Sequence, residues 1–244
     1  MTTPSRLLAD VHLSEQHPAR TALFLQVLGN QAAASTAVYL LGDIFDIWLG
    51  DDDTRPLAVS VATGLRALTT RGVPVYWLAG NRDFLLGPQF GAQTGVQLLP
   101  DPVCLDLHGT PTWLSHGDQF CVDDPAYQAF RHKVRNPAWQ QEFLAKPLAE
   151  RQKIAQGYRA DSQYEQTLKP EAILDVNRTA IDALWTQSPA RRLIHGHTHR
   201  PALHVTTLAD ASMATRYVLP AWEATQGYAL AVDTQRVWLE TYTA

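Results

Sequence analysis

Five short polar motifs, each placed after an apolar, β-rich run, constrain this chain more than any other feature of its sequence. In order, they are Asp10-Val11-His12, Gly42 to Asp46, Gly80 to Asp83, Ser115 to Asp118 and Gly196 to His199. Ligands bind beyond the carboxyl ends of the strands in open α/β sheets. The sequence therefore predicts an α/β fold that gathers the five motifs at one edge of a sheet.

The apolar runs alternate with helical stretches, as in βαβ units. We expect strands at residues 7–9, 37–41, 73–79, 103–107, 112–115 and 193–194, and helices at 20–31 and 57–70. Apolar residues recur every three or four positions in the two helices. The strands are almost continuously apolar, which is typical of a sheet buried on both faces. Further short strands are expected at 202–207, 216–219, 228–232 and 237–242, as a terminal antiparallel set that forms a second sheet face.

Length and composition favour one domain, residues 1–244, over two independent ones. A chain of 244 residues with 45% hydrophobic content can bury a large core. The interval at about 124–177 differs, because its aromatic residues follow helical spacings that are interrupted at Pro137 and Pro147. We interpret it as an insertion of short amphipathic helices that forms a lid over the motifs. The alternative is a helical layer with its own core and a solvated basic face.

Charge and cysteine content narrow the function classes. The net charge of −4 argues against a general nucleic-acid binder, so we expect no nucleic-acid partner. Only Cys104 and Cys121 are present, which excludes a disulfide scaffold and favours a reduced, cytoplasmic setting. The first residues show neither a long apolar h-region nor a cleavage-site pattern, so we expect that the protein is not exported. No apolar run approaches the roughly 20 residues of a membrane span. Seven Lys or Arg residues oppose two Glu between Pro125 and Ala160.

The residue types in the motifs suit two divalent metal ions that share a bridging carboxylate. The candidate ligands are Asp10, His12, Asp43, Asn81, His116, His197 and His199. Asp43 is the natural bridge. The ligand set of the first ion would be completed by Asp10, His12 and His199, and that of the second ion by Asn81, His116 and His197. Mixed oxygen and nitrogen ligands without thiolate suit Mn²⁺ or iron better than structural zinc, and we expect Mn²⁺.

Neighbouring polar residues have expected supporting roles. Asp46 and Asp83 are predicted to orient ligating histidines, and His195 to support the site from beneath. The run from Asp51 to Asp53 is interpreted as a solvated turn and helix cap rather than a third metal site.

The ordered motifs resemble those of the calcineurin-like metallophosphoesterases, which carry D-x-H, G-D-x-x-D, G-N-[HR]-D, a later His and G-H-x-H. The resemblance covers most of the chain outside the insertion. It implies a four-layer α/β/β/α sandwich, with the seven ligands divided between the two ions as above. Many members have a proton-donating His where this chain has Arg82. An Arg cannot act as a general acid near neutral pH, although it can hold a phosphate. This favours a leaving group that is already stable, such as a phosphate with a second pKa of about 6, and hence a pyrophosphate bond.

A narrower resemblance, which includes the insertion, is to the UDP-2,3-diacylglucosamine pyrophosphohydrolase family of lipid A biosynthesis. The matching blocks are residues 41–46, 48–52, 80–87, 116–118, 123–124, 127–131, 175–177 and 195–201. The resemblance implies that activated water attacks the phosphorus nearer uridine and yields UMP and 2,3-diacylglucosamine 1-phosphate. It implies catalytic roles for Asp43, Asn81, Arg82 and His116. Implied substrate contacts are Asn81, Arg82, Asp124, Ser162, Lys169 and His197, with Gln166 standing where the family has Asn.

The implied substrate is a nucleotide-linked glycolipid, whose acyl chains need an apolar site. Candidates under the lid are Trp48, Tyr127, Phe130, Trp139, Phe143, Leu148, Ile154 and Tyr158. Basic residues at the rim of the lid would favour peripheral binding to the cytoplasmic face of the inner membrane, and we expect a monomer. Two rival hypotheses stay open: a generic phosphodiesterase or phosphatase of the same superfamily, and a non-catalytic scaffold with this fold.

Overall fold

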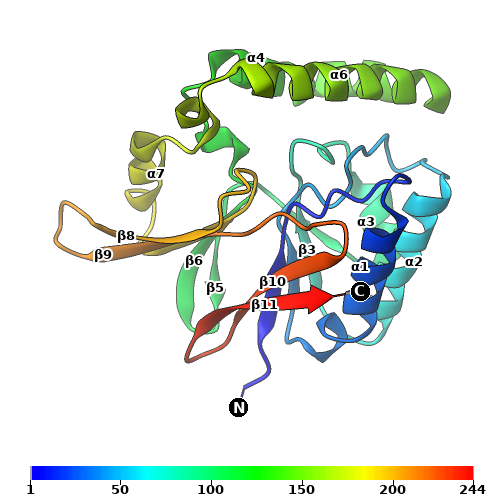
Figure 1. Ribbon diagram of the computed structural model, residues 1–244. Helices are drawn as coiled ribbons and strands as arrows, with labels where there is room; N and C mark the ends of the chain where they lie inside the picture. The colour runs from blue at the N-terminus through cyan, green and yellow to red at the C-terminus, as the bar shows by residue number, and fades with distance from the viewer. Residues whose placement is uncertain (1, 244) are drawn as a thin grey trace.

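Two β-sheets pack against each other in the computed structural model, which describes residues 2–243 except the side chains of 163, 165–168, 171 and 172 (Figure 1). The first sheet has the strand order β11-β10-β1-β2-β3-β4 and the second has the order β5-β6-β7-β9-β8. The first comprises β1 (Ser5–Leu8), β2 (Val38–Leu40), β3 (Val75–Leu78), β4 (Gln97–Leu99), β10 (Gln226–Val232) and β11 (Val237–Thr243). The second comprises β5 (Val103–Leu107), β6 (Thr110–Ser115), β7 (Arg192–His195), β8 (Ala202–Thr207) and β9 (Met213–Val218).

Helices cover the outer face of each sheet and complete four layers. The first sheet is covered by α1 (Pro18–Gly29), α2 (Pro56–Thr70) and α3 (Pro88–Thr94), and α7 (Arg178–Trp185) packs on the second. Single 3-10 turns occur at Ala32–Ala34, Asp118–Phe120 and Glu171–Leu174. The expected α/β/β/α sandwich is confirmed.

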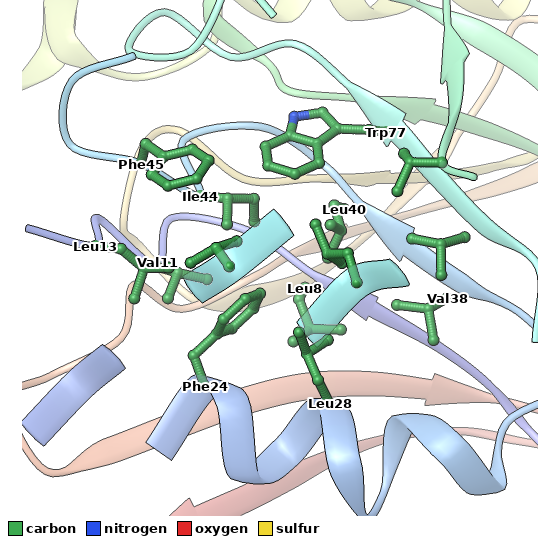
Figure 2. Packing of buried hydrophobic residues seen from close by; sticks show 14 of the residues in the cluster. Leu8, Val11, Leu13, Phe24, Leu28, Val38, Leu40, Ile44, Phe45 and Trp77 are labelled. Atoms are coloured by element: carbon green, nitrogen blue, oxygen red, sulfur yellow. The ribbon is translucent and has the colours of Figure 1, made fainter. Parts of the chain in front are cut away.

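The alternation of side chains along each strand divides the core into layers, because successive residues of a strand point to opposite faces. Leu8 and Leu40 belong to the cluster packed under the helices, whereas Leu7 and Leu41 belong to the cluster between the sheets. Figure 2 shows Phe24 of α1 pointing toward the strand side chains. Burial on both faces explains why these strands are apolar throughout.

The strands β1, β2, β3 and β4 are parallel, as are β6, β7 and β9. The terminal strands do not form one set as expected. The β8–β9 hairpin extends the second sheet, and the β10–β11 hairpin pairs with β1 in the first. A pattern of short alternating strands identifies the strands but not their partners. The short elements α3 and β4 were also missed, since each spans only a few residues.

The expected insertion consists of α4 (Pro125–Val134), α5 (Pro137–Leu144) and α6 (Leu148–Leu168), with the predicted breaks at Pro137 and Pro147. The expectation that all its helices are short is wrong for α6, which has 21 residues. Gly157 lies inside α6, where a single Gly costs only about 1 kcal/mol and does not end a helix. Figure 1 shows α6 running across the top of the sandwich. Within the described chain, no helix is both long and apolar enough to cross a membrane.

Candidate active site

The five motifs meet at one edge of the sandwich, because each follows the carboxyl end of a parallel strand. Three of them follow β1, β2 and β3, which are in register with one another, and two follow β6 and β7. Gly42 permits close approach of the motif loops: a Cβ atom there would lie 2.5 Å from the Gly80 Cα atom. Its φ of +83° also lies in the left-handed region, where glycine is unstrained.

The backbone at the candidate ligands is strained. Non-glycine residues rarely adopt positive φ, and each such residue costs of order 1–3 kcal/mol. Positive φ occurs at five of the seven candidates, namely Asp10 (52°), His12 (50°), Asp43 (54°), His197 (70°) and His199 (55°). Such strain persists where the surrounding structure holds it, and it is concentrated at functional sites. The fold therefore holds these side chains in fixed directions.

The candidates for the first ion converge. The Oδ1 atom of Asp10 lies 3.4 Å from Nε2 of His199, which lies 3.1 Å from Nε2 of His12. Asp10 is fully buried, yet its Oδ1 atom and the Nδ1 atom of His12 have no hydrogen-bond partner among the described residues. Buried polar atoms without partners are costly, and a cation is the partner that a carboxylate oxygen and an imidazole nitrogen share.

The candidates for the second ion also converge. The Oδ1 atom of Asn81 lies 2.9 Å from His116 Nε2 and 2.9 Å from His197 Nδ1, while Asp43 Oδ1 lies 3.6 Å from His116 Nε2. Asp10 can join either His12 and His199 or Asp43 and His116 in a group whose ligand atoms all lie within 4.8 Å of one another. The two ligand sets are thus adjacent, and oxygen and nitrogen donors without thiolate fit two divalent ions. The bridging role of Asp43 stays a prediction.

Burial and mutual charge shift the protonation of these groups. Burial raises the pKa of Asp43 to about 7. Burial lowers the pKa of His116, but the Asp43 and Asp10 carboxylates outweigh it and raise that pKa to about 9. Burial lowers the pKa of His197 to about 3, with a further contribution from His116. Without metal, a proton on His116 partly neutralises the carboxylates. A divalent ion would take over this compensation and displace the proton.

Of the two residues expected to orient histidines, Asp83 has another role, whereas Asp46 lies within ion-pair distance of His12. Asp83 accepts hydrogen bonds from the backbone N–H groups of Gly80 (2.7 Å) and Ile44 (2.9 Å). It therefore links two motif loops. Asp46 Oδ1 is 3.7 Å from His12 Nδ1, beyond hydrogen-bond distance, and pairs with Arg159 of α6 at 2.8 Å.

Two other histidines take their orientation from the backbone or a neighbouring cation. The Nδ1 atom of His116 lies 2.9 Å from the Leu41 carbonyl oxygen, which leaves Nε2 facing Asn81 and Asp43. His195 is fully buried beneath the site, where it contacts the Gly196 carbonyl and Arg216.

Asp118 joins the lid to the motif loops, a role that the sequence analysis missed. The fully buried Asp118 accepts hydrogen bonds from Tyr127 Oη (2.9 Å) and Arg131 Nε (2.8 Å), both on α4. Arg135, one turn further along, donates to the Ala79 and Gly80 carbonyl oxygens at 3.2 and 3.0 Å. The signal available in the sequence was the four-residue spacing of Tyr127, Arg131 and Arg135, which places all three on one helix face.

Two basic residues of α6, Arg151 and Arg159, point inward, whereas Lys153 is exposed, so the alternative of a solvated basic face is wrong for the two arginines. Arg151 is buried and donates to Asp52 Oδ1 (2.8 Å) and the Leu49 carbonyl (2.6 Å). Asp51 accepts from the Gly87 and Phe90 N–H groups and so caps α3. The expected turn and cap are therefore both present in the run from Asp51 to Asp53, where the Asp52 side chain is exposed and Asp53 is buried.

A cavity of about 530 Å³ extends from the metal motifs under the lid. At one end lie Asn81, Arg82, His197 and His199. Away from them lies an aromatic cluster of Phe84, Phe130, Trp139, Phe143 and Tyr158. Trp48, Leu85 and Tyr127 also line the cavity, and the Tyr127 ring lies 5.7 Å from that of His197. Of the eight residues expected there, Leu148 and Ile154 do not line it, and Ile154 packs on the main core instead.

Most of the expected substrate contacts also line this cavity. Arg82 Nη2 lies 3.4 Å from Ser162 Oγ, and Lys169 forms an ion pair of 2.8 Å with Asp124. That pair joins the beginning of α4 to the residue that follows α6. The Gln166 side chain lies outside the described residues, so its expected contact stays a prediction.

Known proteins resemble this chain in sequence and in fold. Residues 6–201 match the model of the calcineurin-like phosphoesterase family. A UDP-2,3-diacylglucosamine hydrolase from Edwardsiella ictaluri is 47% identical over 95% of this chain and 89% of its own length. One from Xanthomonas campestris pv. campestris is 46% identical over 96% of each chain. Among solved structures, an archaeal phosphodiesterase gives a TM-score of 0.49 at 9% identity, over 99% of each chain.

Proposed function

This chain belongs to the calcineurin-like phosphoesterase family, and from that premise we propose that it hydrolyses the pyrophosphate bond of UDP-2,3-diacylglucosamine in lipid A biosynthesis. The products are UMP and 2,3-diacylglucosamine 1-phosphate. The observation that carries the proposal is a cavity lined both by candidate metal ligands and by aromatic side chains under a lid. The names of the relatives, which align over nearly the whole chain and its lid, support the same substrate.

We assign the seven convergent side chains to two divalent ions, with Mn²⁺ as the expected metal. Asp10, His12 and His199 belong to the first ion, Asn81, His116 and His197 to the second, and Asp43 to both. When bound, such ions supply an activated water at neutral pH and stabilise negative charge that develops on the phosphate oxygens. The strained loops hold their ligands in place before metal or substrate arrives.

Arg82 acts on the phosphates by charge rather than by proton transfer. Burial lowers the pKa of Arg82 from its ordinary value, with Asp43 opposing the shift, but a guanidinium stays protonated in proteins. Its Nε atom is buried without a hydrogen-bond partner among the described residues and its Nη2 atom faces Ser162, so it has donors available for a substrate oxygen. A positive charge here stabilises the departing phosphate, which needs no general acid.

The acyl chains occupy the aromatic end of the cavity, and the head group lies near Asp124, Ser162 and Lys169. The volume of about 530 Å³ falls within the range of about 300 to 1,000 Å³ that is typical of small-molecule sites.

Turnover in ¹⁸O-labelled water tests the proposal directly. We expect the label in UMP, because water attacks the phosphorus nearer uridine, and none in the lipid phosphate. The rate constant kcat/KM should exceed that for bis(p-nitrophenyl) phosphate by at least about a hundredfold, since the simple diester gains no binding energy from the lid. Label in the lipid product would refute the direction of attack. Comparable rates on both substrates would favour a generic phosphodiesterase.

We also propose that the protein is a cytoplasmic monomer that binds peripherally to the inner membrane. The basic residues contribute less than expected, because Arg131, Arg135, Arg151 and Arg159 contact groups of the core. Exposed apolar side chains around the lid, such as Leu144 at 39% exposure, offer contact instead.

Flotation with anionic liposomes tests membrane binding, and gel filtration tests the monomer. We expect Leu144→Glu to weaken flotation. The matched variant Leu239→Glu, on β11 at 48% exposure, should not. The membrane proposal fails if the wild-type protein does not float.

A further inference from the structure

A second, smaller cavity of about 240 Å³ lies beside α6. It is enclosed by the segment after β1, the loop after β2, the start of α2 and one face of α6. Its lining residues are Leu13, Ser14, Glu15, Gln16, Asp46, Ile47, Arg55, Leu57, Gln152, Gln156, Arg159 and Ala160. The metal-ligand assignment and the lipid site make no use of most of these side chains.

The two cavities adjoin each other at Asp46, next to the candidate ligand His12. Asp46, Ile47 and Arg159 line both of them. The Asp46 carboxylate lies between Arg159, at 2.8 Å, and the candidate ligand His12, at 3.7 Å. A substrate whose reacting phosphorus sits at the metals could therefore place one end in each cavity.

The charges in the smaller cavity are already paired. Arg159 pairs with Asp46, and Arg55 pairs with the buried Asp53 at 2.6 Å and with Glu15 at 3.5 Å. An additional phosphate would find no unpaired cation among the described residues that line this cavity. The paired charges thus favour an uncharged ligand in the smaller cavity.

The remaining side chains fit a flat ring that forms hydrogen bonds. Gln152 and Gln156 are one turn apart on the same face of α6. Their side-chain amides, each with donors and an acceptor, make no hydrogen bond within the described part of the chain. Leu13, Ile47 and Leu57 supply apolar surface for the faces of a ring.

We infer that the smaller cavity binds the uracil base and ribose of the nucleotide, while the larger cavity binds the diacylglucosamine. This inference rests on the proposed function and adds a location for the half of the substrate that the lid does not hold. Uracil presents one N–H donor between two carbonyl acceptors, which glutamine amides can match. A cavity smaller than the usual range of about 300 to 1,000 Å³ suits a nucleoside rather than a whole glycolipid.

Calorimetric binding of UMP and of ribose 5-phosphate to the Mn²⁺-loaded protein isolates the contribution of the base. Both ligands carry the phosphate and the sugar, so their affinity ratio reports uracil alone. We expect the wild-type protein to bind UMP more tightly. Gln152→Leu and Gln156→Leu should each weaken UMP binding by about threefold to tenfold, the equivalent of one lost hydrogen bond, and leave ribose 5-phosphate unchanged.

Two further variants sharpen the test. Gln156→Glu keeps the shape of the side chain but removes its amide donors, and it should also lower the ratio. Gln141→Leu, an exposed glutamine of α5 outside both cavities, is the matched control and should leave the ratio unchanged.

Equal affinity for the two ligands in the wild-type protein would overturn the inference, as would an unchanged ratio in all three cavity variants. UMP release from the UDP-linked lipid, measured on the same preparation, separates this result from failure of the proposed function. If the wild type releases no UMP, the proposed function fails. If UMP is released but the ratio does not respond, only the location of the base is wrong.

Discussion

The two ends of the large cavity hold their side chains by different means. At the metal end, left-handed backbone conformations and buried hydrogen bonds such as those of Asp83 fix the loops. At the lid end, regular helices carry the aromatic side chains, and ion pairs to Asp118, Asp52 and Asp46 attach them to the sandwich. Chemistry needs a few atoms in fixed positions, whereas an acyl chain needs only apolar volume. The two ends should therefore respond differently to substitution.

The largest effect is expected at the metal end, where Asp43→Ala or His116→Ala should lower UMP release by at least about a thousandfold. Removing a single stabilising group from an active site commonly costs about 10² to 10³ in rate, and each of these residues also holds metal. Metal content measured by mass spectrometry should fall in parallel, while circular dichroism shows that the fold persists. The exposed His132→Ala of α4 is the control. Near wild-type turnover in either variant would contradict the two-metal assignment.

A smaller, substrate-dependent effect is expected at the lid end. Trp139→Ala should lower kcat/KM roughly tenfold to a hundredfold for a long-chain substrate, because burying a large apolar side chain is worth about 1.5–3 kcal/mol. A short-chain analogue should lose little. Trp139 stacks on Phe143, so thermal unfolding should be measured alongside.

Trp238→Ala, on β11 and away from the cavity, is the matched control for this variant. Equal losses on both substrates would mean that Trp139 supports the lid but does not contact acyl chains.

The smallest expected effect is the change with pH in the free energy of unfolding of the metal-free protein. The folded pKa of His116, about 9, lies above its ordinary value of 6.5, so the folded state binds this proton more tightly. The resulting stability is complete below about pH 6.5 and is lost as the pH rises through about 9. In EDTA the melting temperature should fall over this window, by about 2 to 4 °C for each kcal/mol lost.

Mn²⁺ should abolish this fall in melting temperature. The His116 imidazole is already deprotonated when it ligates a metal, so it has no proton to lose as the pH rises. The difference in melting temperature between metal-loaded and metal-free protein should therefore widen with pH. An identical pH dependence in the two forms would contradict a role for His116 as a ligand.

The metal end could be predicted from sequence far more completely than the lid. Each ligand motif is local, follows a strand and carries residues whose chemistry is specific. The lid depends on pairs distant in sequence, such as Arg159 with Asp46 and Arg151 with Asp52. A run of basic residues looks the same in a sequence whether it faces solvent or the carboxylates of another part of the chain. For the same reason, the sheet that each terminal hairpin joins could not be predicted.

The contact between Asp118 and α4 limits how freely this insertion could be exchanged among related proteins. Asp118 is two residues from His116, and the arginines that pair with its buried carboxylate, Arg131 and Arg135, belong to the insertion. Excising the insertion would leave the Asp118 carboxylate without its arginine partners beside a candidate metal ligand. This would lower the free energy of unfolding by about 3 to 5 kcal/mol. A chimera with a different cover must change Asp118 as well. Gain or loss of the insertion during evolution would thus require coordinated change in the catalytic loop.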